Sequence, residues 1–216
     1  MRILVAGCSG NFGKLASDLF TRRGHEVTGI GRKEQDSVDL SEFDICVLSI
    51  PVLEMGRYIE KAQGCTIVEV SSVKNPLKKY QGKIISIHPM FGPRSFSDPD
   101  FQNIIYVDDL SAMGGKKIIE TLFPGFNLVN MTADDHDRAM VEMLIKPFLM
   151  SRIASEISRE TLSFSGPSQK ALQNLSSIWA SEKLEMMEQT IRLNPYSEGA
   201  LKEIMDAVTR IGKELV

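Results

Sequence analysis

The chain begins with Arg-Ile-Leu-Val-Ala at residues 2–6 and continues with Gly-Cys-Ser-Gly-Asn-Phe-Gly at residues 7–13. The apolar run of residues 3–6 predicts a buried strand, and the apolar positions of residues 12–20 recur at helical spacing. The glycines follow the pattern G-x-x-G-x-x-G, in which a tight turn lets backbone amides and a helix N-terminus approach a pyrophosphate. The pattern predicts that a dinucleotide cofactor is bound by Gly7, Ser9, Gly10, Asn11, Phe12 and Gly13.

A second strand follows this turn and its helix. Gly24 ends the helix and residues 26–30 read as a strand, which completes a strand–turn–helix–strand unit. Further strands are expected at residues 44–49, 66–70, 84–87, 104–107 and 127–130. Helical patterns fit between some of them, near residues 53–63 and 111–122. The alternation predicts an α/β fold with a Rossmann-type, doubly wound and mostly parallel sheet.

The pattern changes after residue 131. Thirteen of the sixteen glycines precede this point, and helical patterns follow it at residues 132–162, 168–192 and 197–215. Thr132 is a predicted helix cap, and Pro147 a predicted kink. We therefore expect two domains: a dinucleotide-binding domain at 1–131, and a small all-helical substrate and dimerisation domain at 132–216.

Six of the eleven methionines lie in the helical part. They fit a core between packed helices, and they also fit an apolar surface between two subunits. Both interpretations stay open at this point. Because the helical part is short for an independent domain, we expect it to pair with a second copy and form a homodimer.

Composition excludes several classes of protein. The formal net charge of −3 gives no basic footprint for nucleic acid. Cys8, Cys46 and Cys65 have no C-x-x-C spacing and the three histidines are far apart, so we expect neither a metal site nor a disulfide framework. No run of about 18 apolar residues occurs, so we expect no membrane span. This cysteine usage, with no apolar leader, indicates a cytoplasmic protein.

The end of the second strand bears on the choice of cofactor. A site for NAD usually has an acid there, which binds the ribose hydroxyls, but this chain has Arg32 and Lys33. Two cations suit a 2′-phosphate, so the sequence favours NADP over NAD, unless both cations are only solvated. Ser49 and Pro51 follow a later strand, where they are expected to meet the cofactor or to shape the backbone beside it.

Polar segments follow two other apolar strands. One is Glu69-Val-Ser-Ser-Val-Lys74 and the other is His88-Pro-Met-Phe-Gly-Pro93. Both should lie at the carboxyl edge of the sheet, beside the nicotinamide. His88 is suited to accept a proton near neutral pH, because the ordinary pKa of imidazole is about 6.5. The alternative is a purely structural histidine at the end of a strand.

With these segments the chain resembles the prephenate dehydrogenase family, including its arogenate-using relatives. The family carries an acid-x-x-Ser-Val-Lys segment, then His-Pro-Met/Ile-x-Gly, then an acid-His-Asp run, which matches Asp135-His136-Asp137 here. In order, these matches extend from residue 7 to about residue 140. The resemblance implies an oxidoreductase of tyrosine biosynthesis that oxidatively decarboxylates prephenate or arogenate with NADP.

The resemblance also implies roles for individual residues. A hydride passes to the nicotinamide from the ring carbon that bears the 4-hydroxyl, and the ring carboxylate leaves as carbon dioxide. Aromatisation drives the reaction, so no metal is needed. His88 matches the family histidine that handles the hydroxyl proton, and Ser72 the serine that hydrogen-bonds beside it. Ser71, Lys74 and His136 are the expected substrate-binding residues, although Lys74 could instead be exposed and His136 could anchor its helix.

Some family features are missing. The family's carboxylate-binding arginine corresponds to Ser177 or Ile178, and its Pro-His pair to Pro147-Phe148. Arg152 and Arg192 are candidate replacements for the anion anchor. Two alternatives therefore stand beside the leading one: a dehydrogenase of a different small substrate, and a non-catalytic NAD(P)-binding sensor.

Overall fold

The structure is a computed structural model that describes residues 1–31, 38–158, 164, 166–181 and 184–215. The chain divides into two compact units, Met1–His136 and Asp137–Val216. The division falls inside a helix, a few residues after the boundary that the glycine pattern suggested. Each unit is described by itself. None of the described helices has both the length and the apolar content needed to cross a membrane.

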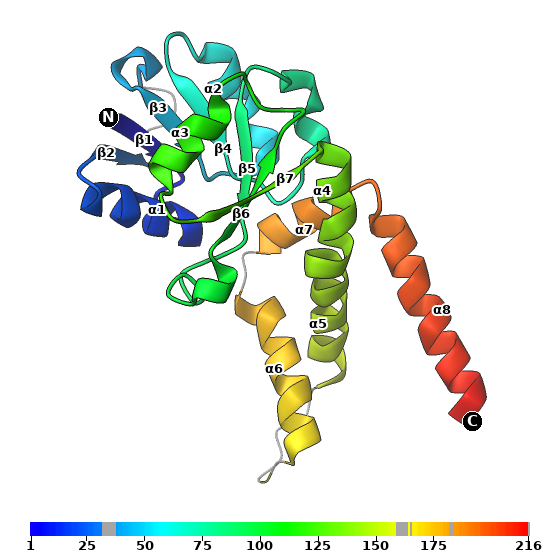
Figure 1. Ribbon diagram of the computed structural model, residues 1–216. Helices are drawn as coiled ribbons and strands as arrows, with labels where there is room; N and C mark the ends of the chain where they lie inside the picture. The colour runs from blue at the N-terminus through cyan, green and yellow to red at the C-terminus, as the bar shows by residue number, and fades with distance from the viewer. Residues whose placement is uncertain (32–37, 159–163, 165, 182–183, 216) are drawn as a thin grey trace. The chain divides into compact units, whose positions relative to one another are not determined.

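The N-terminal unit contains a seven-stranded sheet with the order β2-β1-β3-β4-β5-β6-β7 (Figure 1). The strands are β1 (Arg2–Ala6), β2 (Glu26–Ile30), β3 (Ile45–Leu48), β4 (Thr66–Glu69), β5 (Ile85–Pro89), β6 (Asn103–Val107) and β7 (Asn127–Met131). All neighbours are parallel except β5 and β6. The strand order reverses beside β1, and the crevice at such a point is where open α/β sheets bind ligands.

Helices and short 3₁₀ turns connect these strands. The helices are α1 (Asn11–Arg22), α2 (Gly56–Lys61) and α3 (Gly115–Leu122), and the turns are η1 (Leu40–Glu42), η2 (Val52–Glu54), η3 (Asn75–Tyr80) and η4 (Pro99–Phe101). The predicted α/β fold with a mostly parallel sheet is confirmed. The helix expected at 111–122 begins only at Gly115, because the left-handed Gly114 (φ 81°) precedes it. The helix expected at 53–63 is divided into η2 and α2.

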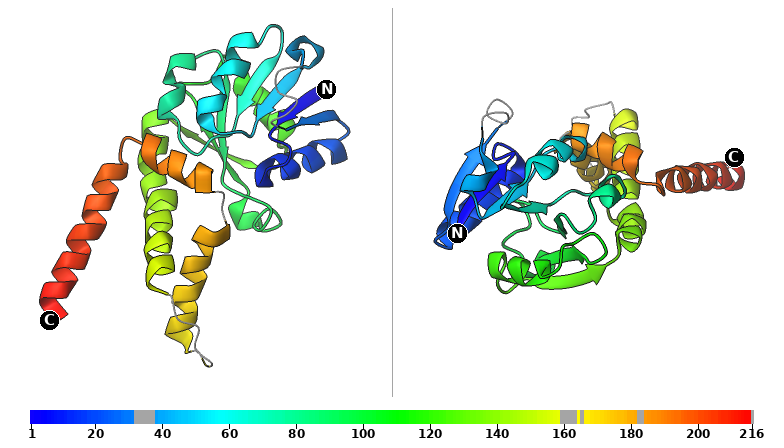
Figure 2. Two further views of the ribbon diagram at one scale, coloured as in Figure 1. Left: turned by 180° about the vertical axis from the view of Figure 1, so that it is seen from behind. Right: turned by 90° about the horizontal axis from the view of Figure 1, so that it is seen from above.

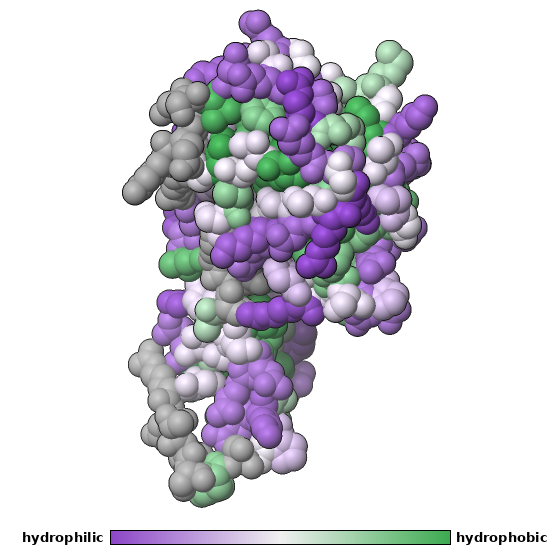
Figure 3. All heavy atoms as spheres, turned by 90° about the vertical axis from the view of Figure 1, so that its left-hand side faces the viewer, coloured by the Kyte–Doolittle hydropathy of each residue, from purple (hydrophilic) through white to green (hydrophobic). Residues whose placement is uncertain are grey.

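The core lies where the sequence places its apolar strand runs. Residues 3–6 of β1 and all of β3 are buried, as a sheet covered on both faces requires. Aromatic rings fill the space between helices and sheet: Phe20 meets Phe123 with ring centroids 5.4 Å apart, and Phe91 meets Phe126 at 5.0 Å. Hydrophilic side chains cover much of the face shown in Figure 3, with apolar patches between them.

The C-terminal unit is helical. Its elements are the end of α4 (Ala133–Met140), the π-helical η5 (Val141–Ile145), α5 (Lys146–Ile157), α6 (Pro167–Ser181), α7 (Leu184–Leu193) and α8 (Ser197–Leu215). The first long helix was expected to kink at Pro147, and the π-helical segment lies directly before it. Proline has no N–H to donate and crowds the preceding turn, which accounts for this local change of hydrogen-bond pattern. The helix expected at 168–192 is described as α6 and α7.

The last helix, α8, carries an apolar face that the rest of its unit leaves exposed. The residues of this face are Leu201, Met205, Val208, Ile211 and Leu215, each between 45% and 80% exposed. Lys146 anchors the helix near its start through Glu203, with 2.7 Å between nitrogen and oxygen. Beyond this point α8 runs away from α5 (Figure 2). Met140 and Met187 are fully buried, as expected for a core between helices. Met205 is 61% exposed, as expected for an apolar surface.

Candidate functional site

The glycine turn after β1 has the geometry that its sequence predicts. Gly7 has a φ of +88°, and a Cβ there would lie 2.0 Å from the carbonyl oxygen of Ser49. A Cβ at Gly13 would lie 2.1 Å from the carbonyl oxygen of Gly7. Gly10 begins α1 without a side-chain cap. The helix therefore presents its first-turn amides and the positive end of its dipole without a side chain in front of them.

Two neighbouring strands hold this turn. The backbone N–H groups of Gly7 and Cys8 donate to the carbonyl of Ile30, at 2.9 and 3.3 Å. Ser49 donates its N–H to Ala6 at 2.9 Å, which joins the ends of β1 and β3. Pro51 follows as the residue that starts η2. The carboxyl ends of β1 and β3 therefore carry the glycine turn and the segment with Ser49 and Pro51 next to one another.

The remaining predicted cofactor residues differ in what the structure says of them. Ser9 and Asn11 are exposed on the turn, and Phe12 packs against Phe91 with ring centroids 6.0 Å apart. This contact brings the His88–Pro93 segment to the glycine turn. Arg32 and Lys33 lie outside the described residues. The choice between NADP and NAD therefore stays a prediction from sequence.

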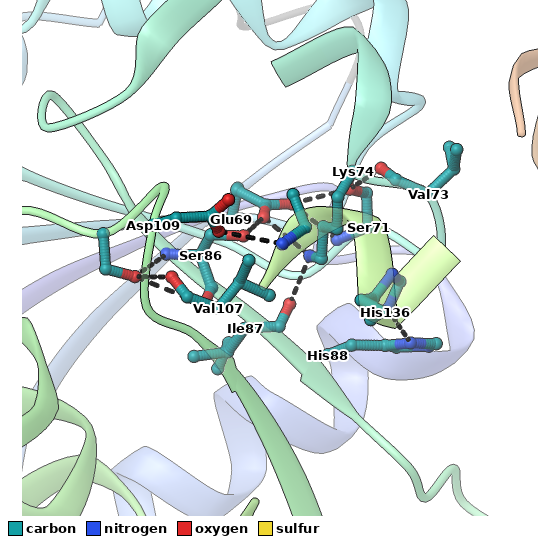
Figure 4. A network of polar contacts seen from close by, with 12 residues as sticks. Glu69, Ser71, Val73, Lys74, Ser86, Ile87, His88, Val107, Asp109 and His136 are labelled. Atoms are coloured by element: carbon teal, nitrogen blue, oxygen red, sulfur yellow. Dashed lines mark hydrogen bonds and ion pairs between the residues drawn. The ribbon is translucent and has the colours of Figure 1, made fainter. Parts of the chain in front are cut away.

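A buried ion pair lies at the carboxyl end of β4 (Figure 4). Lys74 Nζ is 2.6 Å from Glu69 Oε1, and both side chains are 0% exposed. The same ammonium donates to the carbonyl of Ile87 at 2.8 Å. Ser86 donates its hydroxyl to Glu69 Oε1 from β5. The other carboxylate oxygen, Oε2, accepts from the N–H and the hydroxyl of Ser71, at 2.8 and 2.7 Å.

This arrangement changes the interpretation of two predicted substrate-binding residues. Lys74 is buried, so the view that it is an exposed cation is wrong. Its burial also gives no support to direct contact with an anionic substrate. The Ser71 hydroxyl is occupied within its own turn by Glu69 and by the carbonyl of Val73, 2.8 Å away. Ser72 is half-buried, and its side chain has no hydrogen-bond partner among the described residues.

Two histidines that are 48 positions apart in sequence meet at the end of β5. His88 Nδ1 lies 3.0 Å from His136 Nε2, and the two rings, which come from β5 and α4, are tilted at 59° to one another (Figure 4). His88 is 6% exposed and His136 is 0% exposed. Thr132 fixes the start of α4, because its hydroxyl accepts from the N–H of Asp135 at 3.1 Å, as the predicted cap requires. Asp109 adds a second anchor by accepting from the N–H of Ala133 at 2.8 Å.

Both imidazoles are neutral near neutral pH. Burial lowers the pKa of His88 well below its usual range, and the neighbouring His136 and Lys74 lower it further. Burial, with a contribution from Lys74, lowers the pKa of His136 to about 2. His25, by contrast, lies in the turn before β2, with its ring 6.4 Å from Phe20 and away from this pair. That agrees with its structural interpretation.

The candidate anion anchors of the C-terminal unit already have acidic neighbours. Arg152 pairs with Glu156 at 2.5 Å and lies 5.0 Å from the ring of Trp179. Arg192 is 3.9 Å from Glu188. Within the described part of the chain, no cluster of histidine, cysteine or acidic residues could hold a metal ion.

The sequence indicates no role for Glu69 beyond its place in a motif, and it does not indicate Ser86 at all. Both are fully buried polar residues in the cluster around Lys74. Glu69 sits in a run of buried strand residues, and an acid at such a position requires a partner. That requirement is the signal by which the sequence could have indicated the ion pair.

No family model matches this chain. A curated relative, the T-protein of Enterobacter agglomerans, is 25% identical over 150 residues, which are 64% of this chain and 40% of that protein. The chain thus spans well under half the length of this relative.

Several solved structures resemble this one along nearly the whole chain. The prephenate dehydrogenase from A. aeolicus, in complex with hydroxyphenyl propionate and NAD⁺, has a TM-score of 0.72 at 14% identity and covers 99% of this chain and 90% of that one. The Synechocystis arogenate dehydrogenase has a TM-score of 0.59 at 22% identity, over 99% and 93%. An imine reductase from Streptomyces aurantiacus has 0.53 at 16%, over 97% and 94%. The resemblance noted in the sequence is confirmed: this chain has the fold of prephenate and arogenate dehydrogenases.

Proposed function

We propose that this protein is an NAD(P)-dependent dehydrogenase that oxidatively decarboxylates prephenate or arogenate, a step of tyrosine biosynthesis. The observation that carries the proposal is the neutral pair of His88 and His136 at the carboxyl edge of the sheet. A neutral imidazole at this edge can take the proton of a substrate hydroxyl. The similarity to solved prephenate and arogenate dehydrogenases supports the choice of substrate class.

The glycine turn fits a dinucleotide. The close approaches at Gly7 and Gly13 leave no room for side chains, and no side chain caps the first-turn amides of α1. We assign pyrophosphate binding to this turn, with Ser9, Asn11 and Phe12, and place Ser49 and Pro51 beside the cofactor. When bound, the nicotinamide accepts a hydride from the substrate ring. Arg32 and Lys33 support NADP, whereas the A. aeolicus relative was solved with NAD⁺.

The contact between the two histidines determines which nitrogen of His88 must carry the hydrogen. His88 uses Nδ1 in its contact with His136, so Nε2 remains for the substrate hydroxyl. Nε2 can accept a proton only if Nδ1 carries the hydrogen, and Nδ1 must then donate to Nε2 of His136. We therefore assign His136 the role of selecting the His88 tautomer, as a carboxylate does for the histidine of a hydrolase triad. The Ser72 hydroxyl has no hydrogen-bond partner in the described part of the chain, and we propose that it binds near the substrate hydroxyl.

A second candidate is a dehydrogenase of a different small substrate. In α6 the position of the family arginine holds Ser177, which donates to the carbonyl of Asn174 at 2.7 Å, or Ile178. Arg152 and Arg192 already face carboxylates. A substrate without the second carboxylate of prephenate would need no such anchor.

A turnover assay separates these candidates. The full chain is incubated with prephenate or arogenate and with NAD⁺ or NADP⁺, and reduced cofactor is followed at 340 nm. We expect substrate-dependent reduction, with the higher kcat/KM for NADP⁺. No turnover of either substrate, together with measurable cofactor binding, would favour the different-substrate dehydrogenase or the sensor. A preference for NAD⁺ would remove the role given to Arg32 and Lys33.

We also propose that the protein is a homodimer, with the apolar face of α8 packed on a second copy. An exposed face of this kind on a regular helix is typical of a subunit contact. Changing Val208 to Glu places a charge at its centre, and we expect a shift from dimer to monomer in sedimentation velocity. Arg210→Glu, on the opposite side of the helix, is the matched control and should remain dimeric. A monomeric unmodified chain would refute this proposal.

The cellular location is proposed to be cytoplasmic. Cys8, Cys46 and Cys65 are all free thiols in the structure. Free cysteines persist most readily in a reducing compartment.

A further inference from the structure

The Glu69–Lys74 pair connects three segments that bear on the site. Glu69 ends β4, Lys74 lies in the loop before η3, and their hydrogen bonds reach Ser71 in the turn between them and Ile87 in β5. Ile87 is the residue directly before His88. The pair therefore touches both polar segments at the sheet edge without facing solvent.

We propose that the buried pair of Glu69 and Lys74 is a positioning device for His88. It joins the carboxyl ends of β4 and β5 and sets the direction in which the imidazole leaves the sheet. Glu69 holds the Ser71 turn through two hydrogen bonds, and Lys74 holds β5 through the Ile87 carbonyl. The inference rests on the proposed function, because it assigns these residues to the site of that reaction.

The pair has an electrostatic consequence as well as a mechanical one. The groups that face His88 are His136 from α4 and Lys74 from the loop, with Glu69 behind the lysine in β4. From β6, the residue paired with His88 is the apolar Ile105. Burial is the main cause of the lowered pKa of each imidazole, and the Lys74 ammonium lowers both pKa values further. The pair therefore helps to hold His88 neutral before the reaction, which is the state in which an imidazole can accept a proton.

A purely structural ion pair would make the same contacts, so a measurement of stability alone does not test the proposal. Buried pairs are not in general more stabilising than apolar residues of the same volume. A pair without influence on His88 would leave the titration of that imidazole unchanged. The test therefore measures that titration and not only folding.

The experiment follows the imidazole ¹⁵N signals of the full chain against pH, without substrate. In the unmodified protein we expect the pKa of His88 to lie well below its ordinary value. In Lys74→Met its pKa should rise by about one unit, and Lys74→Arg should restore the original titration. Lys83→Met makes the same change at an exposed lysine and should leave His88 unaltered.

A second variant protects the test against misfolding. Lys74→Met leaves Glu69 buried without its cation, whereas Glu69→Gln/Lys74→Met removes both charges and keeps an acceptor for Ser71. We expect the double variant to show the same direction of shift. Folded variants whose His88 titrates as in the unmodified protein would overturn the proposal, and so would an unmodified His88 that titrates near 6.5.

The titration is independent of turnover, so it separates the two proposals. If no substrate is oxidised but the His88 signals shift as expected, the proposed function fails and the positioning role stands. If turnover is found, the acidic limb of the kcat/KM profile should move in Lys74→Met by the same amount as the NMR pKa. A profile that does not move would assign the base elsewhere.

Discussion

Replacing His88 with Asn is expected to lower kcat by about a thousandfold while the affinity for the dinucleotide changes less than about twofold. Of the two neutral imidazoles at the carboxyl edge of β5, His88 is the one that the strand itself carries, and its Nε2 takes no part in the contact between them. Asn occupies a similar volume and can hydrogen-bond to His136, but it cannot take a proton. The loss therefore belongs to proton transfer and not to a collapsed site.

Two measurements check this prediction. Steady-state kinetics with the substrate that passes the turnover assay gives kcat, and calorimetric titration with NADP⁺ gives the dissociation constant. His25→Asn is the matched control, because it makes the same change at a histidine beside Phe20 and away from the pair. We expect it to retain full turnover. An Asn variant of His88 within tenfold of the unmodified enzyme would remove His88 from its role as base.

The sequence could predict the sheet and the edge at which the site lies. Its apolar runs are long enough to specify buried strands, and polar segments directly after them must emerge at one edge of parallel strands. The glycine turn and Ser72 follow the strands that the sequence predicts for them, and His88 lies at the end of its predicted strand. The antiparallel pairing of β5 and β6 also had a signal: residues 90–102 show no crossover helix, which a parallel connection usually needs.

The contacts across the site could not be predicted in the same way. His136 meets His88 because α4 is anchored at Thr132 and at Asp109, which lies beyond β6. Lys74 turns inward because Glu69 and Ile87 supply acceptors from two different strands. Spacing along the chain fixes the strand on which a residue sits, but the direction of a loop side chain depends on partners far away in sequence. The motif therefore identified Lys74 without revealing that it is buried.

The neutral histidine pair should make the fold unusually sensitive to mild acid. Both pKa values are lowered in the folded protein, so the folded state binds fewer protons than the unfolded chain below pH 6.5. Stability is then greatest above pH 6.5 and falls as the pH drops. Each such histidine contributes a slope that approaches about 1.4 kcal/mol per pH unit below pH 6.5, so the pair costs about 2 kcal/mol between pH 6.5 and 5.5.

Urea unfolding of the unmodified chain at several pH values between 7 and 5 measures this slope. His136→Gln places an amide beside His88 and removes one titrating group, and we expect it to halve the slope of the free energy of unfolding against pH. His25→Asn is the control: the pKa of His25 is also lowered, chiefly by partial burial, but it is far less buried and should contribute little. The carboxyls of Asp39 and Asp44, whose pKa values are lowered by hydrogen bonds, titrate only below about pH 4 and therefore do not contribute to the slope between pH 7 and 5.

A free energy of unfolding that stays constant from pH 7 to 5 would mean that the two histidines are protonated as readily in the folded protein as in the unfolded chain. The tautomer assigned to His88 would then lose its physical basis.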